Sequence, residues 1–175
     1  MNAVTETLSD WRDSIVDFLP AGGIARPLGV VLGVYVLVTV ILGVYWSMSP
    51  SEFDVQERAA AYAVEDGGSV VTGSVTTGAL MGVVETLLEK PGGFIHNDIF
   101  PPGLWLDNMP NWEYGVIVQV RDLARSMREV HSRSQSQSLE DPDLALAEPR
   151  FNFNTESWMF PASESEYRDG LNYTR

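Results

Sequence analysis

The side chains best suited to catalysis or metal binding in this sequence are two histidines and the acids near them. His96, Asn97 and Asp98 follow one another directly, and His131 comes some 35 residues later. An imidazole beside a carboxylate can serve in acid–base chemistry, and two histidines can join acids in a zinc site. The spacing matches no compact metal motif, which favours surface or helix-capping roles. We therefore assign no catalytic, cofactor-binding or metal-ligating residue, and expect no cofactor.

A Ser-His-Asp arrangement stays open because serines are abundant. The G-x-S-x-G turn that presents a nucleophilic serine does not occur in the sequence. An envelope hydrolase or metal-dependent enzyme that uses His96 and Asp98 is therefore the alternative function.

Three acids in the last quarter of the chain raise the question of calcium. Glu140, Asp141 and Asp143 supply the hard oxygen ligands that calcium prefers. The twelve-residue loop pattern with a central Gly and a terminal Glu is absent. We interpret these acids as a solvated turn.

Several aromatic residues fall in segments that are rich in turn-forming residues. Trp105, Trp112, Trp158 and Phe160 could together form a platform for a carbohydrate or a peptide. The alternative, which we favour, is that they pack a small helical core against its loops.

The elements that position these residues are constrained first by composition. The chain has 175 residues, with 11 Lys and Arg against 24 Asp and Glu and a formal charge of -13. This acidity argues against nucleic-acid binding, which needs clustered positive charge. The chain has no cysteine, which excludes disulfides and thiolate metal sites.

One segment predicts a membrane span. Residues 28–46 contain no ionisable acid or base, and as a helix they would be about 28 Å long, close to the hydrocarbon thickness of a bilayer. Arg26 precedes them, and Tyr45 and Trp46 end them where aromatic rings favour the interface. A buried soluble helix and a cleaved signal peptide are the alternatives. Retention as an anchor is favoured, because the 27 preceding residues are long and acid-bearing for a signal peptide.

The orientation of this span follows from the positive charges beside it. Arg12 and Arg26 precede the span, whereas Arg58 alone follows it up to Asp66. The positive-inside rule then predicts a cytoplasmic N-terminus and a periplasmic C-terminal region in an inner membrane.

The predicted organisation has four parts. They are an amphipathic stub (1–27), the transmembrane helix (28–46), a juxtamembrane segment (47–68) and a helical extracytoplasmic domain (69–175). The apolar stripe of the stub could rest on the bilayer or dock a protein partner; its members are Val4, Leu8, Trp11, Ile15 and Phe18. Gly29 and Gly33 lie four apart in the span, where small residues let two helices approach, so a weak homodimer is possible.

Beyond the span the patterns predict further helices. Residues 69–90 are weighed as a second span, but Glu85 and many Ser, Thr and Gly residues favour an amphipathic helix that stops at Pro91. A longer helix should start with Asn108 as its cap, carry Glu113 in its first turn and end near His131. A short helix is expected at 141–147. A last helix should open with a capping box of Ser163 and Glu166. The fold class is therefore mainly α, with irregular Pro-rich and aromatic loops.

Three runs carry a resemblance to a known family. They are PPGLWLDNMPNWE (101–113), RSQSQS with EDPDLA (133–138 and 140–145) and SESEYR (163–168). Over about residues 26–170 the chain resembles the Gram-negative inner-membrane family called domain of unknown function 2333. The resemblance implies one N-terminal anchor and a mostly helical domain, but no activity. Members of that family extend further, so it also implies that the chain is the N-terminal half of such a protein and that the helical domain is incomplete.

These features together predict a membrane-anchored, non-enzymatic scaffold or partner-binding protein of the bacterial cell envelope. The expected partners are the lipid bilayer and a protein that binds either the N-terminal helix or the extracytoplasmic domain.

Overall fold

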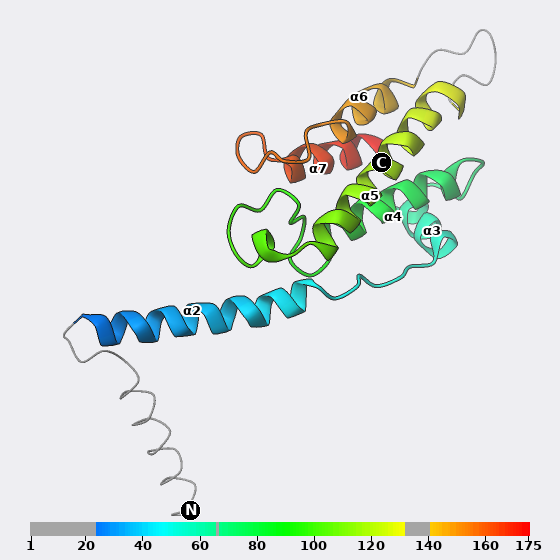
Figure 1. Cartoon of the computed structure of the whole chain (residues 1–175). Coiled ribbons are helices and arrows are strands. Elements are labelled where there is room, and N and C mark those ends of the chain that lie inside the picture. Colours follow the sequence, from blue (N-terminus) through cyan, green and yellow to red (C-terminus); the bar gives the residue numbers. More distant parts are fainter. Residues whose placement is uncertain (1–23, 66, 132–140) are drawn as a thin grey trace, which may run out of the picture. The chain divides into compact units, whose positions relative to one another are not determined.

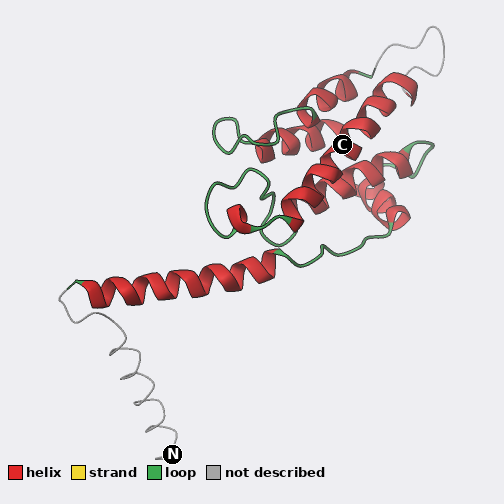
Figure 2. Ribbon diagram, in the orientation of Figure 1, coloured by secondary structure: helices red, strands yellow, loops and turns green. Residues whose placement is uncertain are grey.

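The computed structural model describes residues 24–65, 67–131 and 141–175, and the helical stripe predicted for residues 1–27 lies almost wholly outside them. Within the described parts the chain is helical and contains no strand, which confirms the predicted fold class (Figures 1 and 2). The elements are α2 (Ala25–Trp46), α3 (Val55–Glu65), α4 (Ser74–Glu89), η1 (Gly103–Trp105), α5 (Asn108–Ser126), η2 (Met127–His131), α6 (Pro142–Phe151) and α7 (Ser163–Thr174).

The chain divides into two units, one ending at Leu42 and the other running from Gly43 to Arg175. The first unit contributes most of α2. Five consecutive side chains of α2, from Val34 to Val38, are each 42–60% exposed. Because five residues cover more than a full helical turn, α2 presents apolar side chains on every face. It is the one candidate span in the described residues, over Arg26–Trp46.

The second unit, which we term the compact unit, is a small bundle. Helix α6 packs against α7, α4 contacts α5 and α7, α5 also contacts α6, and α3 lies along α4. Its core is a single cluster of buried side chains; the largest members are Leu80, Leu87, Ile117, Phe151 and Tyr167. Helix α4 supplies the stripe Leu80, Val84, Leu87 and Leu88 to this core, which confirms the predicted amphipathic helix.

Helix α4 approaches α3 closely because of a glycine. A Cβ added at Gly78 would lie 2.8 Å from the Cβ of Ala59. The Gly content of α4 thus serves helix packing within the compact unit.

Two predicted helix caps are wrong, and both side chains are engaged elsewhere. Asn108 is the first residue of α5; the residue at the cap position is Asp107, whose side chain makes no capping bond. The Asn108 amide instead reaches Ser47 O at 3.4 Å. Helix α7 begins at Ser163 itself, whose hydroxyl donates to the carbonyl oxygens of Asn154 and Ser157.

The second member of the predicted capping box also pairs with another element. Glu166 accepts a hydrogen bond of 2.5 Å from Arg150, in α6. The ion pair between α6 and α7 replaces the local contact that the sequence pattern indicates.

Candidate functional site

A fully buried ion pair joins the end of α4 to α5. Lys90, the only lysine in the chain, follows α4, and Glu113 lies in the second turn of α5. Lys90 Nζ lies 2.5 Å from Glu113 Oε1, and both side chains are 0% exposed. The sequence predicted Glu113 in the first turn of this helix, whereas the structure places it in the second turn, buried.

The pair organises the turn between the two helices. Lys90 also donates to Gly93 O at 2.6 Å. Glu113 accepts hydrogen bonds from the backbone N–H groups of Ile95 (3.0 Å) and His96 (2.6 Å). Burial raises the pKa of the Glu113 carboxyl above 4.5, against the opposing effect of Lys90 and these amides. Because Lys90 binds both Glu113 and Gly93 O, and Glu113 accepts from Ile95 and His96, the pair is suited to holding this turn in place.

His96 is held by its ring as well as by its backbone. Nδ1 lies 2.9 Å from the carbonyl oxygen of Pro110, which can only accept, so Nδ1 carries the proton and donates. The ring also stacks on Tyr114, with centroids 5.7 Å apart. The contacts of His96 are thus those of a residue that fixes the loop to α5.

Asp98 lies in the same loop but faces other groups. Its carboxylate packs so closely on Gly103 that a Cβ there would overlap it. Burial raises the pKa of the Asp98 carboxyl above 3.8, and nearby Glu164 raises it further, whereas Lys90 lowers it. The charges that act on Asp98 come from Glu164 and Lys90. The structure therefore gives no sign that Asp98 orients the His96 ring for catalysis.

Asn97 joins two loops that are far apart in the sequence. Its amide nitrogen donates to Ser157 O (2.7 Å) and to Glu164 Oε2 (3.0 Å). Asn97 is buried, and its Oδ1 has no hydrogen-bond partner among the described residues. The loop that follows Phe94 is thereby fixed to the loop that precedes α7.

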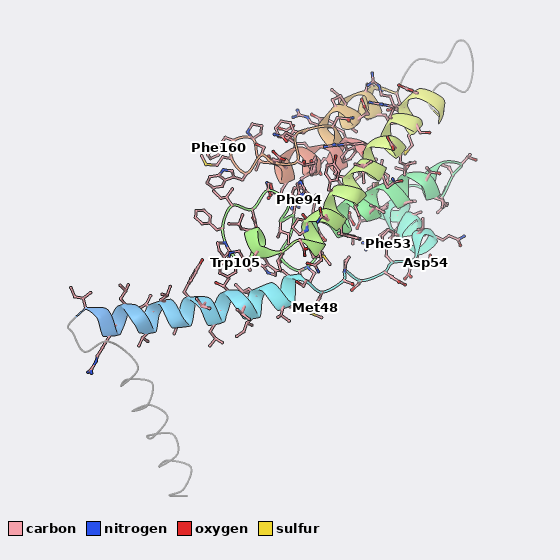
Figure 3. All side chains as sticks on the ribbon, in the orientation of Figure 1. Met48, Phe53, Asp54, Phe94, Trp105 and Phe160 are labelled. Atoms are coloured by element: carbon pink, nitrogen blue, oxygen red, sulfur yellow. The ribbon has the colours of Figure 1, made fainter. Side chains whose placement is uncertain are left out.

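These two loops carry an exposed apolar surface, which we call the aromatic surface. Its members lie between α4 and α5 or between α6 and α7, and are Phe100 (67% exposed), Leu104 (59%), Trp105 (59%), Trp158 (49%), Met159 (52%) and Phe160 (96%). Phe100 and Trp158 make an edge-to-face contact across the loops, with centroids 6.5 Å apart. Figure 3 shows Phe160 and Trp105 projecting from these loops. The prediction that Trp105, Trp158 and Phe160 pack the core is wrong, although Trp112 does pack against it.

A second polar cluster ties α3, α4 and α7 together. Glu85 accepts a hydrogen bond of 2.5 Å from Tyr62 and one of 3.2 Å from Arg58. Arg175 also pairs with Glu85, at 3.8 Å. Burial raises the pKa of the Tyr62 phenol above its ordinary range, and Glu85 raises it further. The cluster links helices and leaves its acid fully engaged.

The acids considered for calcium have a structural role where they are described. Asp141 caps α6, and its Oδ1 accepts hydrogen bonds from the backbone N–H groups of Asp143 and Leu144. Glu140 and the side chain of His131 lie outside the described residues. Over the ranges that the structure covers, no three His, Asp or Glu side chains group as metal ligands would.

An apolar groove runs along α4 and α5. Its volume is about 420 Å³, and its walls include Phe53, Val83, Trp112 and Val116. Thr86 and the residues Pro50, Ser51 and Glu52, which lie between α2 and α3, complete its lining.

Sequence reasoning missed both the buried pair and part of the aromatic surface. The single lysine next to Pro91-Gly92-Gly93 was one available signal, because a charged side chain beside a tight turn can bind the carbonyl groups of that turn. Phe100 and Leu104, which lie on either side of Pro101 and Pro102, were another, because the two prolines prevent one continuous helix or strand from burying both side chains.

The fold and these sites define a mainly helical protein whose described residues contain one candidate membrane span. Residues 20–175 match the family described as "Uncharacterized protein conserved in bacteria (DUF2333)", so the chain belongs to that bacterial family. The resemblance seen in the sequence is confirmed and reaches further in both directions. No curated protein and no solved structure matches the chain.

Proposed function

We propose that this protein is a non-enzymatic scaffold or partner-binding protein that α2 anchors in the inner membrane of the bacterial cell envelope. The observation that carries the anchor is the apolar circumference of α2, exposed from Val34 to Val38. Water would hydrate those side chains at a large free-energy cost, whereas a bilayer of matching thickness removes it. A retained span also keeps the last ring of α2 where it packs, because a Cβ added at Gly92 would lie 2.8 Å from Trp46 Cδ2.

The proposed orientation places the N-terminus in the cytoplasm and the compact unit in the periplasm. It rests on Arg12 and Arg26 before the span against Arg58 after it. Because the chain has no cysteine, an introduced Cys is a unique reporter. Glu57→Cys in intact spheroplasts should react with an impermeant thiol reagent, and Asn2→Cys should react only after permeabilisation. The reverse pattern would overturn the orientation.

The non-enzymatic part of the proposal draws on His96 and Asp98. His96→Asn retains an N–H close to the position of Nδ1, and Asp98→Asn keeps the shape of the side chain. Both variants should support any cellular phenotype of the gene at normal protein level. Loss of that phenotype in either variant, with the protein folded and abundant, would favour the hydrolase or metal-dependent alternative.

Partner binding is proposed for the groove between α4 and α5, whose apolar walls suit a peptide or helix side chain. A photoreactive amino acid at Val116 in living cells should give one discrete adduct. The same group at Asp122, exposed on the same helix, is the matched control. An identical adduct pattern at both positions would contradict the groove as the binding site. The N-terminal stripe and a homodimer through Gly29 and Gly33 remain further proposals.

A further inference from the structure

We propose that the aromatic surface inserts into the interfacial layer of the bilayer that α2 crosses, so that the compact unit rests on the membrane. This inference depends on the proposed anchor. It assigns the aromatic loops a ligand, the lipid surface beside the exit of the span.

The first argument is that the loop after Phe94 contacts the last residues of α2 and the residue that follows it. The Asn108 amide reaches Ser47 O, immediately after α2 ends. Leu106, two residues before Asn108, lies against Gly43. A Cβ added at Gly43 would be 3.9 Å from Leu106 Cδ2 and 3.5 Å from Pro102 Cβ. Ser47 and Gly43 are one helical turn apart, so the loop lies beside the last turn of α2. Leu104 and Trp105 lie in the part of the loop between these two contacts with Gly43.

A second contact fixes the same region. A Cβ added at Gly92 would lie 2.8 Å from Trp46 Cδ2, so the turn after α4 packs on the last aromatic ring of the span. Trp46 is the kind of residue that lies at the headgroup level. The contacts of Gly43, Trp46 and Ser47 thus place both ends of this loop at the membrane–water boundary.

The second argument is the apolar exposure itself. Phe160 is 96% exposed and Phe100 67% exposed, although the same domain buries Phe151 completely. Exposed aromatic and aliphatic side chains that gather on neighbouring loops, as Phe100 and Trp158 do, mark a surface that another apolar phase covers. Tryptophan, which supplies two members of this surface, favours the bilayer interface.

The third argument is that the loops are held ready for insertion. Asn97 bonds Ser157 O, and the Ser157 hydroxyl donates to the carbonyl oxygens of Met159 and Pro161. Ser163 holds the base of the same loop through Asn154 O. Insertion therefore needs little further ordering of the backbone.

Charge indicates which lipids should matter. No Lys or Arg occurs in residues 91–120 or 151–167. Attraction to anionic headgroups is therefore absent from these loops, and their acids, such as Asp98, Asp107 and Glu156, are repelled by such headgroups. Insertion should be at least as deep in bilayers of phosphatidylcholine as in mixtures of phosphatidylethanolamine and phosphatidylglycerol.

The test uses the full chain in lipid nanodiscs with a nitroxide label on a single Cys. Labels at Leu104 and Phe160 report on the aromatic surface. Leu146, in α6, is 51% exposed and serves as the matched control, and Leu37 reports on α2 itself. Collision rates with oxygen and with a water-soluble nickel chelate measure the depth of each label. The ratio of oxygen to nickel collisions should be several-fold higher at Leu104 and Phe160 than at Leu146.

The outcomes separate this inference from the anchor. If Leu37 is in lipid but Leu104 and Phe160 match Leu146, the inference is wrong and the anchor stands. If Leu37 is also exposed to water, both fail. Spectral broadening at Leu104 or Phe160 that disappears on dilution with unlabelled chain would assign the surface to a second copy of the protein and would overturn the inference as well.

Discussion

Lys90 Nζ and Glu113 Oε1 meet at 2.5 Å inside the compact unit, and neither side chain has any exposed area. A buried pair of this kind is costly to break, because removing one partner leaves the other charge without a counter-ion in a medium of low dielectric constant. The pair is also the point where the loop toward the aromatic surface is attached to α5.

Lys90→Met in the full chain should therefore reduce the free energy of unfolding by about 3–5 kcal/mol. The double variant Lys90→Met/Glu113→Gln should recover part of this loss. The neutral glutamine at position 113 removes the buried charge, and its side-chain carbonyl oxygen can still accept hydrogen bonds from the N–H groups of Ile95 and His96. Urea unfolding in detergent, followed by ellipticity, measures both. A double variant no more stable than Lys90→Met would contradict the role given to the buried charge.

Gly92→Ala should destabilise the compact unit by at least about 1 kcal/mol, because two costs combine. Gly92 has φ 88°, where a side chain is strained, and a Cβ there would overlap the Trp46 ring. Gly115→Ala, in α5, is the control. A Cβ at Gly115 meets nothing within 4 Å, so this change should stabilise by about 0.5–1 kcal/mol. Equal changes in melting temperature for Gly92→Ala and Gly115→Ala would contradict the role given to Gly92.

Asp98→Asn should stabilise the protein at neutral pH. Burial raises the folded-state pKa of Asp98 above 3.8, so the unfolded chain loses this proton more easily. The stability contributed by the group is fully present below the unfolded pKa and is lost as pH rises through the folded pKa. The advantage of Asn should accordingly be present at pH 7 and shrink toward pH 4. Melting temperatures across that range measure it, with Asp122→Asn as control; an advantage that grew on acidification would have the wrong sign.

Asp141→Ala should cost about 1 kcal/mol, because two N–H groups at the start of α6 lose their acceptor. Asp141→Asn retains a side-chain oxygen and should restore most of the loss. Added calcium should leave the melting temperature of the native chain unchanged. A calcium-dependent rise that Asp141→Asn abolishes would instead establish the metal site considered from the sequence.

The parts of the fold that the sequence predicted depend on local periodicity. An uninterrupted apolar run defines α2 whatever surrounds it, and the spacing of Leu80, Val84 and Leu87 defines the buried face of α4. The family follows equally from short contiguous runs of residues.

The errors concern residues with two possible partners. Ser163 and Glu166 fit a capping box, but Asn154 and Arg150 compete for them across the fold. Trp105 and Phe160 have the composition of core residues, yet their loops hold them outside the helical bundle. Sequence spacing cannot rank such alternatives, because the competing groups come from distant elements.

The sequence by itself determined a mainly helical, acidic chain with one apolar segment of bilayer length, because helix periodicity and hydropathy are properties of neighbouring residues. Only the tertiary structure decided that Lys90 and Glu113 are buried together and that His96 is bound to Pro110. It also brought Phe100 and Trp158 into one surface. These relationships join residues 14 to 58 positions apart, and the packing of α4, α5, α6 and α7 selects them.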